Sequence, residues 1–129
     1  MNEEEMKDRT RRFALRVMRR VEALPATTAG RALGGQLIRA ATSVGANYRA
    51  ACRGRSKAEF VAKLGIAEEE ADESDYWMEL IGDGELVQAQ RLAALRQEAQ
   101  ELRAILTASR RSAGRALGKI ENRKSKIEN

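Results

Sequence analysis

The stretch SVGANYRAACRGRSKAEF, residues 43–60, gathers the residue types in this chain that could do chemistry. It contains the only cysteine, Cys52, several basic residues and a G-x-S-K string that starts at Gly54. Such a loop could cradle a phosphate with its backbone N–H groups, but a phosphate-binding loop needs G-x-x-x-x-G-K-[ST] after a buried β-strand. Neither the spacing nor a strand-forming sequence is present, so we interpret the stretch as a corner between two helices.

This corner carries a stop signal and a start signal. Gly54 stands where the C-terminus of a helix favours a left-handed residue. Ser56 is followed three residues later by Glu59, which is the pattern of a capping box at a helix N-terminus. The G-x-S-K string therefore predicts the end of one helix and the start of the next, and its arginines could in addition meet phosphate groups.

The rest of the chain contains few residues that could catalyse a reaction. Histidine is absent, which removes the commonest general base and the commonest transition-metal ligand. The acidic run from Glu69 to Asp75 could hold a metal, but the di-metal motif of helical bundles pairs a glutamate with a histidine three residues on. With one cysteine there is neither an intrachain disulfide nor a thiolate zinc site. We predict a protein that is not an enzyme and has no metal site and no cofactor.

The elements that must position these residues are helices. Of the 129 residues only one is proline and 4% are aromatic, a composition that favours helices over β-structure. Apolar residues recur at spacings of three and four in four segments, the pattern of helices with one buried side. Their seams are Met6, Thr10, Phe13, Val17, Val21, Leu24; Leu33, Leu37, Ala40, Val44, Ala51; Phe60, Leu64, Ala67, Ala71, Ser74, Met78, Ile81; and Leu92, Leu95, Ala99, Leu102, Leu106, Ser109, Ala113.

These seams predict an all-α fold, an up-down-up-down antiparallel four-helix bundle over residues 1–113. Beyond Ala113 the apolar period fades and the string KIEN occurs twice, so we predict a charged tail over residues 114–129 that is disordered or a frayed extension. No apolar run approaches the roughly 20 residues that cross a bilayer, and we expect a protein of the reducing cytoplasm without membrane contact.

Charge is divided sharply along the chain. Residues 1–58 carry 13 basic and 5 acidic side chains, a net +8; residues 59–85 carry 1 and 10, a net −9; and residues 86–129 carry 10 and 4, a net +6. One predicted helix is thus acidic and the other three are basic. The acidic helix could present a solvated face, pair with basic helices of its own bundle, or pair with a neighbouring subunit.

The basic residues are the candidate binding surface. Arg9, Arg12, Arg16 and Arg19 or Arg20 form a stripe on the first helix, and a second group lies on or after the second helix. Clustered cations are the footprint of a nucleic-acid binder, and with few aromatic residues any strand would be held mainly by its phosphates. The candidate nucleic-acid-binding residues are Arg12, Arg16, Arg19, Arg20, Arg39, Arg49, Arg53, Arg55 and Lys57.

Two smaller features are a polar residue within an apolar helix and a pair of adjacent aromatic residues. Asn47 lies in an otherwise apolar helix, and we interpret it as a structural asparagine with a specific hydrogen bond rather than as a ligand. Tyr76 and Trp77 are adjacent and must point differently, so at least one faces away from the core.

The string from Gln36 to Ile81 resembles the bacterial four helix bundle protein family, also called the 23S rRNA intervening-sequence protein family. Its hallmark is an A-N segment that ends the second helix, a G-R-S-x-x-E-F string that opens the third, and a long acidic helix. Here these elements are Ala46-Asn47, Gly54-Arg55-Ser56 with Glu59-Phe60, and the EEEADES run. The chain departs from the commonest form, which has A-E-G where Ala50, Ala51 and Cys52 stand, so no role of that glutamate carries over.

The resemblance implies a four-helix subunit that assembles into a ring, typically a pentamer. Related proteins include the accessory variability determinant of diversity-generating retroelements, which partners a reverse transcriptase and RNA. A bundle with one acidic and several basic faces would also suit head-to-tail contacts that close into a ring.

Two functions remain open from the sequence. The first is a non-enzymatic homo-oligomeric bundle that binds RNA or DNA electrostatically, as an accessory to a partner enzyme such as a reverse transcriptase. The second is a protein-interaction scaffold without a nucleic-acid role.

Overall fold

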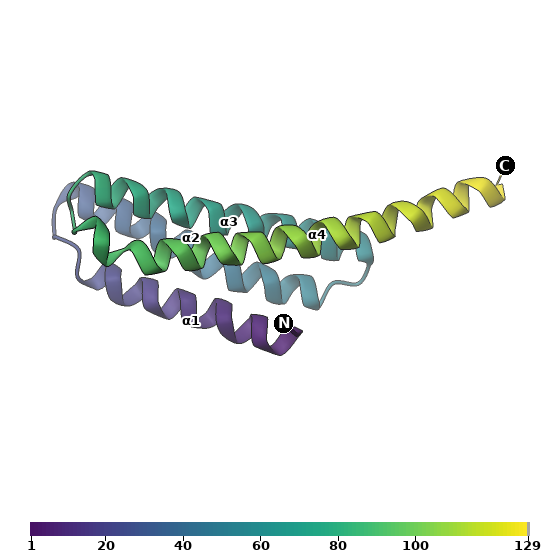
Figure 1. The fold of residues 1–129 in the computed structure, drawn as a ribbon, viewed down its shortest axis with the longest axis horizontal. Coiled ribbons are helices and arrows are strands. Elements are labelled where there is room, and N and C mark those ends of the chain that lie inside the picture. The colour runs from purple at the N-terminus through teal and green to yellow at the C-terminus, as the bar shows by residue number, and fades with distance from the viewer. Residues whose placement is uncertain (129) are drawn as a thin grey trace.

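A computed structural model describes the chain from Met1 to Glu128, with side chains described as far as Ser125. Its helices are α1 (Glu3–Glu22), α2 (Thr28–Cys52), α3 (Lys57–Asp83) and α4 (Ala93–Glu128), with a short 3-10 helix, η1 (Ala89–Arg91), before α4. Residues 1–128 contain no β-strand, and successive long helices run antiparallel, so the predicted four-helix bundle is confirmed (Figure 1). None of the described helices is long and apolar enough to cross a membrane.

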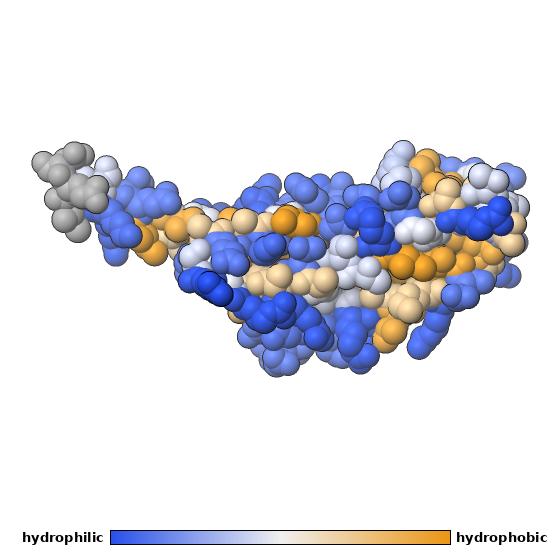
Figure 2. Space-filling model, turned by 180° about the vertical axis from the view of Figure 1, so that it is seen from behind, coloured by the Kyte–Doolittle hydropathy of each residue, from blue (hydrophilic) through white to orange (hydrophobic). Residues whose placement is uncertain are grey.

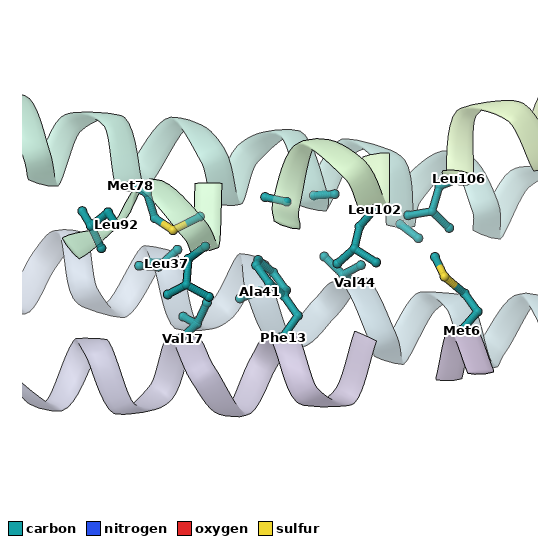
Figure 3. Close-up of a cluster of buried hydrophobic side chains, with 14 of the residues drawn as sticks. Met6, Phe13, Val17, Leu37, Ala41, Val44, Met78, Leu92, Leu102 and Leu106 are labelled. Carbon is teal, nitrogen blue, oxygen red and sulfur yellow. The ribbon is translucent and has the colours of Figure 1, made fainter. Parts of the chain in front are cut away.

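The predicted seams form the core. Phe13 and Val17 of α1, Val44 of α2 and Leu102 of α4 are fully buried and point into the same interior (Figure 3). Thr10 and Ser74 are the two buried polar residues in the described core, and each donates its hydroxyl to a carbonyl oxygen one turn back in its own helix. The helices do not pack equally: α2 and α3 pack closely together, and α1 contacts α4 least.

The corner between α1 and α2 is unusually tight. Thr27 caps α2, because its Oγ1 accepts the backbone N–H of Gly30 at 3.0 Å. Gly30 is buried, and a Cβ added there would lie 2.1 Å from the carbonyl oxygen of Pro25. Since no ordinary contact is that short, the corner closes only with glycine at this position.

The end of α3 is closed by a Schellman motif. The N–H of Glu85 donates to the carbonyl of Gly82 at 3.0 Å, and the N–H of Leu86 donates to that of Ile81 at 3.1 Å. Glu85 is the residue in the left-handed region, with φ of 59°, a conformation that normally costs a residue with a Cβ about 1–2 kcal/mol. Glycine adopts this conformation most readily, but the nearest glycine, Gly84, lies one residue earlier in the chain.

We expect Glu85→Gly to raise the free energy of unfolding by about 1 kcal/mol, because relief of the left-handed strain exceeds the extra chain entropy that glycine loses on folding. Urea denaturation of the two proteins measures the difference. The matched control is Asp83→Gly at the last residue of α3, where the backbone is helical and glycine relieves no strain, so stability should fall by only about 0.3 kcal/mol. Equal effects of the two substitutions would contradict the motif.

The segment after Ala113, for which we predicted disorder or fraying, continues α4 as a helix to Glu128 and projects beyond the bundle (Figure 1). A helix already nucleated in a bundle extends without the cost of a new nucleus, and this segment contains no proline. The space-filling view shows apolar residues along the projecting part, where Ile120 is exposed (Figure 2). The second KIEN string ends at Asn129, outside the described residues.

Candidate nucleic-acid interface

The acidic side chains of α3 are engaged by arginines of the same bundle. On the side facing α4, Arg96 donates to Asp75 at 2.7 Å, and Arg103 lies 3.1 Å from Asp72. Further along, Glu68 accepts from Arg110 and, at 2.7 Å, from Thr107. On the side facing α2, Arg39 contacts Glu70 and Glu73. These acidic side chains of α3 therefore pair within their own bundle, which was the second of the three interpretations of the acidic helix.

A further ion pair joins α1 to α4. Arg9 donates to both carboxylate oxygens of Glu98, at 2.8 and 2.6 Å, and also to Glu101 at 2.7 Å. The hydrogen bond from Arg9 is the main reason that the pKa of Glu98 lies below its ordinary value, against the opposing effect of burial. In the same way, Arg110 lowers the pKa of Glu68, while the indole N–H of Trp77, followed by Arg39, lowers that of Glu73.

These lowered pKa values predict a pH dependence of stability. A carboxyl whose pKa is lower in the folded chain stabilises the fold above its unfolded pKa, and this contribution is lost as the pH falls through the folded pKa. We expect Glu98→Gln to lower the free energy of unfolding by about 1–2 kcal/mol at pH 7, because Arg9 loses its charged hydrogen-bond partner. Below about pH 4.5 the free energy of unfolding of the variant should fall less steeply with decreasing pH than that of the wild type.

Thermal unfolding across this pH range checks the prediction. The matched control is Glu69→Gln on the exposed face of α3, for which the described side chains show no ion pair. It should follow the wild-type profile, and an identical profile for Glu98→Gln would contradict a stabilising pair at Arg9.

The corner between α2 and α3 has the geometry of a helix stop followed by a helix start. Ser56 caps α3, since its Oγ accepts the N–H of Glu59 at 3.1 Å. The carboxylate of Glu59 turns back to the N–H of Arg55, at 3.2 Å, rather than to that of Ser56. The predicted capping residues are thus in place, with the return bond displaced by one residue. Because a helix and not a strand precedes the corner, the phosphate-loop interpretation is excluded.

The prediction that Gly54 is left-handed is wrong, because no described glycine has a positive φ. Arg53 caps α2, and the N–H of Gly54 donates to the carbonyl of Ala51 at 3.0 Å. A Cβ on Gly54 would lie 3.0 Å from the oxygen of Ala51 and 3.4 Å from the nitrogen of Phe60. Glycine therefore serves close approach of α3 to the end of α2.

Four of the predicted binding residues lie in the last turn of α2, in the corner or at the start of α3, although Arg49 also lines a hollow against α1. All are exposed, and no ion pair joins any of them to a side chain that the structure describes. We call this group the corner cluster; its members are Arg49, Arg53, Arg55 and Lys57.

The predicted arginine stripe of α1 divides into separate roles. Arg9 turns to α4 and binds Glu98, and Arg12 pairs with Asp8 on its own helix at 2.8 Å. The remaining residues line a hollow between α1 and α4 that we call the α1–α4 hollow; its arginines are Arg16, Arg19, Arg20 and Arg91. Arg91 comes from η1 and is not among the residues predicted from the sequence.

Arg39 lies apart from both groups. Its guanidinium contacts Glu70 and Glu73, so most of its donors are committed within the bundle although half of its side chain is exposed. Of the nine residues predicted to bind nucleic acid, it is the one that the structure places least favourably.

The groove beside the corner contains the cysteine. Glu3, Tyr48, Cys52, Lys57 and Phe60 are among the residues that line this open groove of about 470 Å³. Burial, and then the hydrogen bond with the Glu3 carboxylate, raise the pKa of the Cys52 thiol, which disfavours the thiolate that a nucleophile needs. Burial likewise raises the pKa of Tyr48.

The remaining predictions concern two polar or aromatic sites. The Asn47 amide donates to the carbonyl of Ser43 at 2.9 Å, as expected of a structural asparagine. Trp77 packs against the core and donates its indole N–H to Glu73 at 3.0 Å, whereas half of Tyr76 is exposed. The expectation that one of the two aromatic residues faces away from the core is confirmed.

Comparison with known proteins gives a family and similar solved structures. Residues 2–108 match a family model described as 23S rRNA-intervening sequence protein. A crystal structure of a protein of unknown function from the S23 ribosomal protein family of Bacteroides thetaiotaomicron VPI-5482 has 29% identical residues and a TM-score of 0.78, over 86% of this chain and 99% of that one. No curated protein matches the chain.

Proposed function

The chain belongs to the 23S rRNA-intervening sequence protein family, and from that premise we propose that it is a non-enzymatic bundle that binds RNA or DNA through phosphate contacts. The corner cluster and the arginines at the end of α1 would supply these contacts. In the cell the bundle would act as a homo-oligomer that presents the nucleic acid to a partner enzyme such as a reverse transcriptase.

One observation supports the binding function above the others. Most acidic side chains in the middle of α3 are paired within the bundle, by Arg39, Arg96, Arg103 and Arg110, while other arginines form no ion pair among the described residues. The corner cluster is left without a described carboxylate partner, so the net positive charge of +5 is expressed at sites that face solvent. A cationic surface of this kind attracts polyanions over distances of about a Debye length.

We expect binding to fall steeply with salt. If the corner cluster contacts four phosphates of a single strand, the logarithm of the affinity should fall with the logarithm of salt concentration with a slope of about −3. Fluorescence anisotropy with a labelled single-stranded RNA and a DNA of the same sequence, between about 50 and 200 mM salt, measures the slope. Absence of binding to either strand at the lowest salt would favour the scaffold function instead.

The homo-oligomer, with a pentameric ring as the proposed form, rests on the family resemblance alone. Charge attraction between subunits gives head-to-tail contacts little support, because the acidic residues of α3 that would attract a neighbour are already paired within the bundle. Native mass spectrometry counts the subunits directly, and a monomer at micromolar concentration would remove the ring from the proposal.

The absence of catalysis is also a proposal with a direct test. The protein should leave nucleotides and phosphoesters unchanged on prolonged incubation, with or without divalent cations. Turnover that purifies with the protein and is lost on adding a chelator would contradict it.

A further inference from the structure

The α1–α4 hollow brings together cations from two distant parts of the chain. It measures about 270 Å³ and is lined by the arginines already named together with Ala94 and Leu95 of α4. It lies between the last two turns of α1 and the first turn of α4, two helices that pack together less closely than the other neighbouring pairs of long helices. The small side chain of Ala94 helps to leave the hollow open, and Leu95 is buried beneath it.

No carboxylate lines this hollow. Glu98, one turn after Ala94 on α4, lies close enough to Arg16 for its pKa to be lowered, but its two oxygens accept from Arg9. Glu85, an acid at the same end of the bundle, lines a different hollow with Gln88 and Gln90. The guanidinium groups therefore face one another across the hollow without a described side chain that neutralises them.

Two of these arginines are also held in place from below. Arg20 and Arg91 line a second, nearly closed space of about 40 Å³, together with Val21, Leu24, Leu37 and Leu92. Both side chains thus border apolar residues in one space and the other arginines in the α1–α4 hollow, an arrangement that suits the apolar stem and charged end of arginine. Side chains that are already ordered lose less entropy when they bind a ligand.

We infer that the α1–α4 hollow is a phosphate-binding site, in which Arg91 completes a set of arginines begun by α1. Guanidinium groups bind phosphate oxygens through paired, charge-assisted hydrogen bonds, and several of them suit a group that carries more than one negative charge. The hollow would take the linked phosphates of an oligophosphate, supplied either by a free compound or by the backbone of a nucleic-acid strand.

This inference shares Arg16, Arg19 and Arg20 with the proposed function but does not depend on it. A phosphate site in the hollow can be tested with inorganic compounds whether or not the protein binds a strand. Failure of strand binding would therefore leave the inference standing, and failure of phosphate binding would leave the corner cluster untouched.

The test is calorimetric titration of the full chain with inorganic triphosphate at low salt, for the wild type and for Arg91→Gln. Loss of one charged partner should weaken binding at least about tenfold. Glutamine keeps the first two methylene groups of the apolar stem of Arg91, so the melting temperature should change little. The matched control is Arg111→Gln, an exposed arginine on the outer part of α4, which should bind triphosphate as the wild type does.

Two results would overturn the inference: no heat of binding to the wild type, or an equal loss in both variants, which would mean that triphosphate only senses the overall charge. Competition identifies the source of the phosphates. If a labelled strand is displaced by triphosphate from the wild type but not from Arg91→Gln, the hollow binds the strand backbone. If triphosphate binds without displacing the strand, the site takes a free oligophosphate.

Discussion

Replacing Gly30 by alanine is expected to lower the free energy of unfolding by about 2–3 kcal/mol. The new methyl group would lie 2.1 Å from the carbonyl oxygen of Pro25 and 3.2 Å from Oγ1 of Thr27. The first of these atoms belongs to the backbone of the α1–α2 corner, so the clash cannot be relieved by a change of rotamer. Either the corner opens or the first turn of α2 shifts, and both would strain the cap from Thr27.

Gly35 is the matched control for this substitution. It lies on the exposed side of the same helix, and a Cβ added there meets no atom within 4 Å. Gly35→Ala should therefore raise stability by about 0.5–1 kcal/mol, since alanine is the better helix former. Urea denaturation of both variants measures effects of opposite sign. Stabilisation by both substitutions would show that the corner is looser than the structure describes.

Reversing three charges of the corner cluster is expected to weaken nucleic-acid binding at least about a hundredfold at about 50 mM salt. The variant is Arg53→Glu, Arg55→Glu and Lys57→Glu. Each change removes one phosphate contact and adds a repulsive charge, so the slope of the salt dependence should also become flatter by about 0.7 per residue, from about −3 to about −0.7. The new acids at positions 55 and 57 complement the dipole at the start of α3, whereas the one at position 53 opposes the dipole at the end of α2, so the net change in stability should be small.

The control carries the same change of net charge at another place. Arg111, Arg115 and Lys119 are exposed on α4, and their reversal to glutamate also changes the charge of the chain by −6. Anisotropy titrations should give near wild-type binding for this control. If both triple variants lose binding equally, the strand follows the overall charge of the protein and the corner cluster is not its site.

The fold was predictable because its core depends on local periodicity. Phe13, Leu64 and Leu102 lie on seams that can be counted in the sequence, and all are fully buried. The corner at Ser56 was predictable for the same reason, since a capping signal needs only four consecutive residues.

The site was less predictable because charge pairing depends on how the helices are rotated against one another. Arg9 and Arg12 belong to one stripe in the sequence, yet one binds Glu98 on α4 and the other binds Asp8 on its own helix. Arg39 faces α3 for the same reason. Nothing in the spacing of residues reveals these partners.

Two further features could not be predicted from the sequence because they depend on the path of the loop between α3 and α4. Arg91 lies in a short segment without periodic pattern, and only the packing of η1 against α3 and the start of α4 brings its side chain to the α1–α4 hollow. Among the residues that the structure describes, the left-handed one is Glu85 rather than a glycine, although the turn sequence IGDGEL offers two glycines.

The projecting part of α4 has a hydrodynamic consequence. From Ala113 to Glu128 the helix adds roughly 20 Å to one end of the molecule. A rod of that length increases friction far more than it increases mass, so the protein should elute early from a sizing column and sediment slowly. A count of subunits inferred from elution volume would therefore be too high, and truncation after Ala113 should bring the apparent and true masses together.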